Sequence, residues 1–140
     1  MGYNLDVNYV AVLVSGIAAM IIGGLWYSPI LFGNIWTKLS GFTKKDIAKA
    51  KKQGGMGASY FVTFIGTLVT AFVLSVFVNA ANANTATAGA FIGFLAWLGF
   101  NATEKLSMVL WECRPFSLYV LNTAHGLVTL VVMGSILAVY

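Results

Sequence analysis

Three long stretches of the chain contain no charged residue, and they determine the predicted fold. They comprise 31 residues between Asp6 and Lys38, 51 residues between Lys52 and Glu104, and the 26 residues after Arg114. A transmembrane helix needs about 20 consecutive apolar residues. The first and third stretches are therefore long enough for one span each, and the second for two spans. They predict an all-α membrane protein, a bundle of four transmembrane helices over about 8–27, 58–78, 88–110 and 116–139, in one domain covering 1–140.

The overall composition supports this class. Of 140 residues, 59% are hydrophobic and 9% are charged, and the mean hydropathy is +0.86. Soluble domains carry about 25% charged residues. A water-soluble enzyme or nucleic-acid-binding domain is therefore excluded, and the net charge of +4 is attributed to membrane orientation and lipid contact, with no nucleic acid as a partner.

The loop over 28–57 differs from the spans. Phe32, Ile35, Trp36 and Leu39 follow the i, i+3, i+4, i+7 spacing of a short helix lying in the membrane interface. Clustered basic residues near a cytoplasmic membrane surface attract anionic lipid headgroups. The residues predicted to make this contact are Lys44, Lys45, Lys49, Lys51 and Lys52. A solvated loop helix is the alternative.

The distribution of basic residues predicts the orientation. Loop 28–57 contains six lysines and the third loop contains Arg114, whereas the second loop and the C-terminus contain no basic residue. Cytoplasmic loops carry the excess of Lys and Arg. The first and third loops are therefore expected in the cytoplasm, and both termini outside it.

Small residues recur along the predicted helices, where they allow close approach of neighbouring helix backbones. The predicted packing positions are Ala11, Ser15, Ala19, Gly23, Gly89, Gly93, Gly126 and Gly134. Four short helices bury little interior, so we expect the small-residue faces of the first two helices to support a homo-oligomer, with a larger membrane complex as a further possibility.

Four polar residues at membrane depth form the candidate site: Asn101, Glu104, Asn122 and His125. Asn101 and Glu104 share one face of the third helix through their three-residue spacing, and Asn122 and His125 share one face of the fourth. The two pairs lie at matching depths if these helices are antiparallel neighbours. Such residues usually face the bundle interior. They predict either a protonatable or ligand-binding site or a structural polar patch. The sequence contains no catalytic motif and no His/Cys zinc pattern, so no catalytic residue, metal or cofactor is expected.

Several short motifs resemble one family. They are Gly24-Leu25-Trp26-Tyr27-Ser28-Pro29, Leu31-Phe32-Gly33, Trp36, Trp97-Leu98-Gly99-Phe100, Arg114-Pro115, Asn122, His125-Gly126-Leu127-Val128 and Met133-Gly134. The chain resembles a bacterial membrane family known only as domain of unknown function 1761. The resemblance implies a four-helix protein of the bacterial inner (plasma) membrane without an established activity. Members of the family tend to have an uncharged residue at the position of Glu104 and often Tyr at the position of Ala124. The resemblance therefore favours Asn122 and His125 as site residues.

Three functions are compatible with these features. The favoured hypothesis is a non-catalytic, self-associating bundle or accessory subunit. The alternative is an oligomeric channel or transporter for protons or a small solute that uses the polar levels of the last two helices. A membrane-embedded enzyme ranks third, because the sequence offers Glu104 and His125 as an acid/base pair but no nucleophile.

Overall fold

The computed structural model describes residues 7–28, 30–40 and 55–140. Within these ranges the chain consists of helices and turns without a β-strand, which confirms the predicted all-α class. The elements are α1 (Tyr9–Trp26), α2 (Gly33–Ser40), α4 (Gly55–Ala80), α5 (Ala86–Trp97), the π-helix η1 (Leu98–Ala102), α6 (Leu106–Leu110) and α7 (Phe116–Val139).

Four helical stretches are long and apolar enough to cross a membrane, as predicted. They are Tyr9–Trp26, Tyr60–Ala80, Ala86–Leu110 and Phe116–Val139. Two of their N-terminal ends are fixed locally: the Asn8 side chain accepts hydrogen bonds from the first turn of α1, and that of Thr85 accepts one from the first turn of α5.

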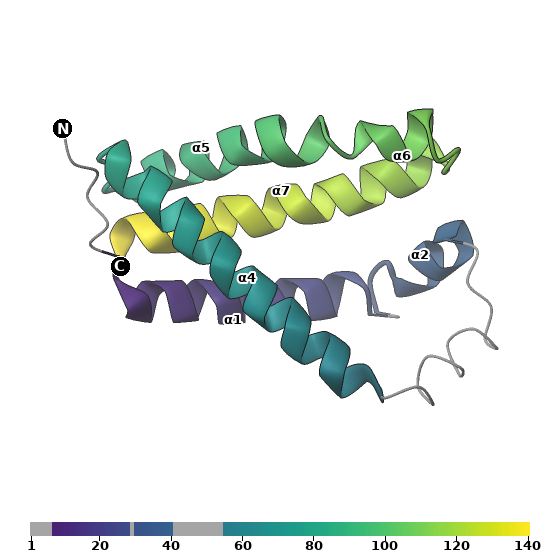
Figure 1. Ribbon diagram of the computed structural model, residues 1–140, viewed down its shortest axis with the longest axis horizontal. Coiled ribbons are helices and arrows are strands. Elements are labelled where there is room, and N and C mark those ends of the chain that lie inside the picture. Colours follow the sequence, from purple (N-terminus) through teal and green to yellow (C-terminus); the bar gives the residue numbers. More distant parts are fainter. Residues whose placement is uncertain (1–6, 29, 41–54) are drawn as a thin grey trace.

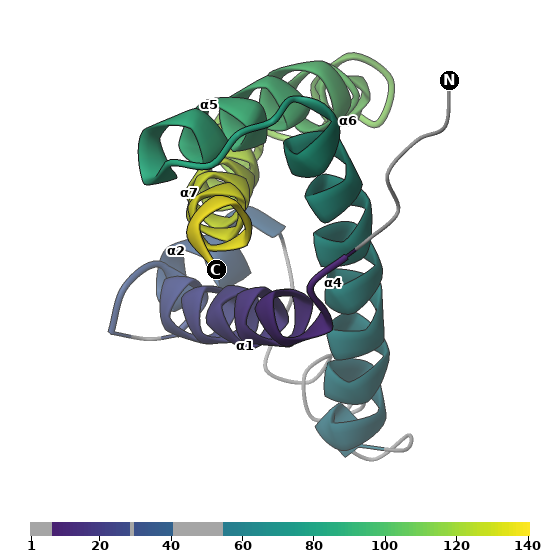
Figure 2. The ribbon, with the colours of Figure 1, turned by 90° about the vertical axis from the view of Figure 1, so that its left-hand side faces the viewer.

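Helix α7 lies at the centre of the arrangement. It contacts α5 on one side, α1 on the other, and α4. Figure 2 shows α5, α7 and α1 stacked in a column with α4 standing along one side of it. In Figure 1, α4 crosses the other three helices obliquely. Helix α4 diverges from α5 and α7 along part of its length, and a pocket lies between these three helices.

The start of α1 and the end of α7 lie at the same end of the molecule (Figure 1). The Asn8 side-chain amide donates a hydrogen bond to the main-chain oxygen of Tyr140 at 3.0 Å. Helix α2 and the turn before α7 lie at the opposite end (Figure 1). This arrangement agrees with four alternating spans, while the direction of the spans across the membrane remains a prediction.

Helices α5 and α7 approach each other through glycine. Gly89 and Gly134 lie backbone to backbone, and Gly93 lies against the backbone of Leu130. A Cβ at Gly89 would lie 2.5 Å from the Cβ of Ala138. Small residues therefore create this contact, in the way that membrane helices associate without a hydrophobic driving force.

The small-residue face of α1 is used within the chain. Ala11, Ser15 and Ala19 are buried by neighbouring helices of the same chain, and α1 contacts α7 and α4. A Cβ at Gly23 would lie 3.4 Å from His125 Nε2. The face that the sequence offered to another subunit therefore packs inside this one.

The third span is not one continuous α-helix, contrary to the predicted helix over 88–110. The π-helix η1 interrupts it, and a turn with i→i+3 hydrogen bonds comes next: Ser107 N donates to Glu104 O at 3.2 Å, and Met108 N to Lys105 O at 3.0 Å. The Tyr119 hydroxyl donates to the carbonyl of Ala102 at 2.6 Å. A side chain of α7 thus satisfies a carbonyl at the irregular segment.

Helix α2 packs on the protein through part of its predicted apolar stripe. The ring of Trp36 lies 5.7 Å from that of Tyr27, and that of Phe32 4.7 Å from that of Trp26. Ile35 remains exposed. The lysines predicted to bind lipid headgroups, Lys44, Lys45, Lys49, Lys51 and Lys52, lie outside the described residues, and their lipid contact stays a prediction.

Candidate functional site

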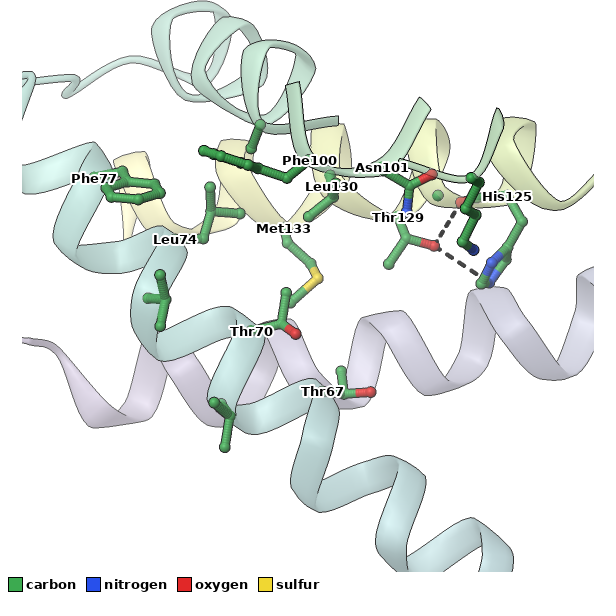
Figure 3. Close-up of a pocket in the computed structure, with 15 residues that line it drawn as sticks. Thr67, Thr70, Leu74, Phe77, Phe100, Asn101, His125, Thr129, Leu130 and Met133 are labelled. Carbon is green, nitrogen blue, oxygen red and sulfur yellow. Dashed lines mark hydrogen bonds between the residues drawn. The ribbon is translucent and has the colours of Figure 1, made fainter. Parts of the chain in front are cut away.

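A pocket of about 640 Å³ lies between α4, the α5–η1 segment and α7 (Figure 3). Its volume falls within the range of about 300–1,000 Å³ typical of small-molecule sites. Its polar lining comes from four parts of the chain: Thr67 and Thr70 from α4, Asn101 from η1, Lys105 from the turn after η1, and His125 and Thr129 from α7. The pocket is therefore assembled by tertiary packing.

The two ends of the pocket differ in polarity. Figure 3 shows Asn101, Thr129 and His125 grouped at one end. The other end is apolar and is lined by side chains of three elements, namely Leu74, Phe77, Phe100, Leu130 and Met133. The apolar part of the pocket lies toward the side of the molecule where α1 begins and α7 ends. The pocket consequently runs from a polar to an apolar environment along the helices.

A second pocket of about 360 Å³ continues the first along α4. It lies between α1, α4 and α7, and its lining includes Tyr27, Tyr60 and Gly23. Thr67, His125 and Thr129 line both pockets. These three side chains therefore separate a space at the Tyr27 end of the molecule from the larger pocket.

His125 is held at this junction by aromatic residues at the end of α1. Its ring centroid lies 5.1 Å from that of Tyr27 and 6.0 Å from that of Trp26. Gly23, which has no side chain, leaves room for the ring. Among the described residues its hydrogen-bond contact is Thr129, whose hydroxyl lies 3.4 Å from Nε2 while donating to the His125 carbonyl at 2.8 Å. The imidazole thus retains hydrogen-bonding capacity toward the pockets.

Asn122 faces α1 and does not line either pocket. Its Oδ1 accepts a hydrogen bond from the Tyr27 hydroxyl at 2.8 Å. Burial raises the pKa of Tyr27 from 10.0 to about 12, so the hydroxyl remains a neutral donor in this bond. Asn122 and His125 are therefore connected through Tyr27, which contacts both.

Asn101 lies against Gly126 of α7, where a Cβ would approach its amide atoms to 2.8 Å. Its amide projects into the pocket toward Thr129 (Figure 3). The amide oxygen is buried without a hydrogen-bond partner in the part of the chain that the structure describes. A buried polar atom without a partner costs about 1–3 kcal/mol, which a hydrogen-bond donor in the pocket, such as a water molecule, would reduce.

Glu104 does not belong to this site, which corrects the sequence prediction. Its side chain is exposed and lines neither pocket, whereas Lys105 lines the larger one. The prediction placed Asn101 and Glu104 on one face of a regular α-helix. The π turn η1 adds a residue and rotates the residues after it by about 100°. The rotation turns Glu104 away from the face of Asn101, whereas Lys105, four positions after Asn101, lines the pocket with it.

Sequence reasoning did not identify Trp26, Tyr27 or Thr67 as site residues. Trp and Tyr at the end of a span are typical of the membrane interface, and a hydroxyl residue within a span often bonds to its own helix. Thr67 does make such a bond, donating to Thr63 O at 2.8 Å. The sequence feature that could have identified Trp26 and Tyr27 as site residues is their position in the first motif that resembles the family.

The groups that line the larger pocket are suited to binding a polar group beside a hydrocarbon. No three His, Cys, Asp or Glu side chains gather as a metal site within residues 7–28, 30–40 and 55–140. The larger pocket instead brings together one ammonium group, one imidazole, one amide and three hydroxyl groups, next to an apolar wall. Such a set can hold a polar group at one end and a hydrocarbon at the other.

One family model matches residues 10–138 and is described as protein of unknown function (DUF1761). The match covers nearly the whole chain, and the chain belongs to this family. Comparisons with curated proteins and with solved structures return no match.

Proposed function

We propose that this member of the DUF1761 family is a non-catalytic membrane protein that binds a small ligand in the pocket between α4, α5 and α7. The observation that carries the proposal is the convergence of Asn101, Lys105, His125 and Thr129, from separate segments, on one end of a partly open pocket at membrane depth. Polar groups at that depth are costly and usually serve a site or pathway.

The shape of the space favours binding over an open channel for protons or ions. The smaller pocket and the polar end of the larger one adjoin in a polar zone at Thr67, His125 and Thr129. Beyond it, Leu74, Phe77 and Met133 line the space with apolar side chains. An ion crossing this apolar section would lose its hydration without replacement.

Self-association, the favoured hypothesis from the sequence, is supported less well. The α1 face that was expected to meet another subunit is buried within the chain, with Ser15 fully covered. An oligomer or accessory complex would have to use a different surface. Gly66 of α4 has no neighbouring atom within 4 Å, but nothing in the structure identifies what would cover it.

The test uses pocket blocking, so the identity of the ligand need not be known in advance. Thr70 lines the larger pocket but is exposed, so Thr70→Trp should fill the space without disturbing the core. The matched control is Val62→Trp on the same helix, since Val62 is exposed and lines neither pocket.

Each protein is purified from membranes in mild detergent, and its bound small molecules are extracted and quantified by mass spectrometry. We expect one component at near-equal stoichiometry with the wild-type protein and the control, and its loss from Thr70→Trp. Identical extracts from all three proteins would refute ligand binding in this pocket.

A further inference from the structure

We infer that the ligand is a single-chain amphiphile with an anionic head group, a carboxylate or a phosphate, whose head contacts Lys105 and whose chain lies along the apolar end of the pocket. This inference rests on the proposed function and specifies the ligand of the same site. It is based on the charge of the lining, on the direction of its hydrogen-bond donors and on its polarity gradient.

The pocket lining is positively charged. Among the described residues that line the space, Lys105 is the only formally charged one, and none carries a carboxylate. The neighbouring Glu104 is exposed and lies outside the lining. Charged groups at membrane depth are normally paired. An anionic head group would supply the partner that the described lining lacks.

The remaining polar groups of the pocket sort into donors and acceptors. The hydroxyls of Thr67, Thr70 and Thr129 donate to main-chain carbonyls of their own helices at 2.8, 3.1 and 2.8 Å. Their protons are therefore occupied. The donors left for a ligand are the Lys105 ammonium and the Asn101 amide nitrogen, while the His125 ring donates or accepts according to its tautomer. A set of donors around one cation matches an anion, which accepts hydrogen bonds and donates none.

The apolar end provides for a hydrocarbon chain. Phe77 and Phe100 lie with their ring centroids 6.5 Å apart, and Met133 and Leu74 complete this end (Figure 3). A volume of about 640 Å³ suits a ligand of drug size. A molecule with one acyl chain and a small head group has this size, whereas a two-chain phospholipid is larger. The open side between α4 and α5 gives such a molecule access from the bilayer.

The experiment compares ligands that differ only in the head or only in the chain. The full-length protein is placed in nanodiscs of zwitterionic phosphatidylcholine, and equilibrium binding of tritiated palmitate is measured above that of empty nanodiscs. Competitors are hexadecanol, which keeps the chain but is neutral, acetate, which keeps the head alone, and palmitoyl lysophosphatidate, which carries a phosphate head. Preference for palmitate or for the lysophosphatidate then identifies the head group.

We expect saturable binding of the preferred anion, at least about tenfold tighter than hexadecanol, which corresponds to about 1.4 kcal/mol, and no competition by acetate. Lys105→Gln should remove this preference while leaving hexadecanol binding unchanged, which shows that the pocket is intact. Lys38→Gln, which changes a lysine of α2 outside the pocket, should behave as wild type.

Two results would overturn the inference. One is hexadecanol binding as tightly as palmitate and lysophosphatidate, and the other is an unchanged anion preference in Lys105→Gln. If the wild-type protein yields a pocket-dependent component that is not an anionic amphiphile, this inference fails and the proposed function stands. If Thr70→Trp changes neither the extracted small molecules nor palmitate binding, the proposed function fails as well.

Discussion

Replacing Gly89 with alanine tests the packing that positions the site. Helix α7 carries His125 and Thr129, and its contact with α5 fixes their distance from η1. A Cβ at position 89 would lie 2.5 Å from the Cβ of Ala138 and 2.8 Å from the carbonyl carbon of Gly134. Carbon atoms pack at about 3.5–4.0 Å. The two helices must therefore separate by roughly 1 Å, because the obstacle is mainly backbone that cannot rotate away.

The expected cost can be estimated from two opposing effects. Overpacking costs about 1–3 kcal/mol, and a gap of about 0.5–1 Å forfeits a quarter to a half of the dispersion energy of each contact that it opens. Alanine recovers about 1 kcal/mol of helix propensity relative to glycine. Subtracting the propensity gain from the overpacking cost leaves a loss of up to about 2 kcal/mol in the free energy of unfolding for Gly89→Ala, and the lost dispersion energy places it in the upper part of that range.

Gly66→Ala is the matched control, because Gly66 lies within α4 with no neighbouring atom within 4 Å. It should leave the protein unchanged or stabilise it by up to about 1 kcal/mol. Both variants are unfolded by titrating dodecyl sulfate into mild-detergent micelles while tryptophan fluorescence is followed. The packing argument is refuted if Gly89→Ala is as stable as Gly66→Ala.

Two further predictions concern the Tyr27 contact and the orientation. In a double-mutant cycle, Tyr27→Phe and Asn122→Ala should show a coupling free energy of about 0.6 kcal/mol, the usual value for hydrogen bonds between membrane helices, and zero coupling would contradict the bond. Because the pKa of Tyr27 is raised from 10.0 to about 12, its contribution to stability should be complete below about pH 10 and lost as the pH rises through 12, and Tyr27→Phe should lack that loss. For the orientation, a membrane-impermeant maleimide should reach the exposed Cys113 only from the cytoplasm, and Asn82→Cys in a Cys113→Ser background only from outside. Labelling of both from one side would contradict the predicted arrangement.

The four spans were predictable because their signal is local. A stretch of about 20 uncharged, apolar residues has few alternatives in a membrane protein, and Thr85 and Pro115 mark the starts of the last two spans. The small-residue spacing also identified positions of close backbone approach, as at Gly89 and Gly134. Spacing alone does not identify the partner helix, so the α1 face was assigned to another subunit when it packs against its own chain.

The site was only partly predictable, because its geometry depends on a local irregularity and on long-range contacts. Asn101 and His125 were placed together correctly from their depth. Glu104 lies outside the pocket because the π-helix η1 interrupts the regular helical period. A prediction based on a regular period cannot anticipate this change. Tyr27 joins Asn122 and His125 across 95 residues of sequence, and no periodicity within one helix reports such a contact.

The most direct test of the account locates a bound chain within the protein. A palmitate analogue with a photoreactive diazirine near its methyl end is added to the protein in phosphatidylcholine bilayers, and the adducts are mapped by mass spectrometry after illumination. The account predicts adducts concentrated on Phe77 and Phe100 at the apolar end of the pocket, and their loss in Thr70→Trp but not in Val62→Trp. Adducts spread over exposed residues such as Phe61 and Phe91, unaffected by Thr70→Trp, would contradict it.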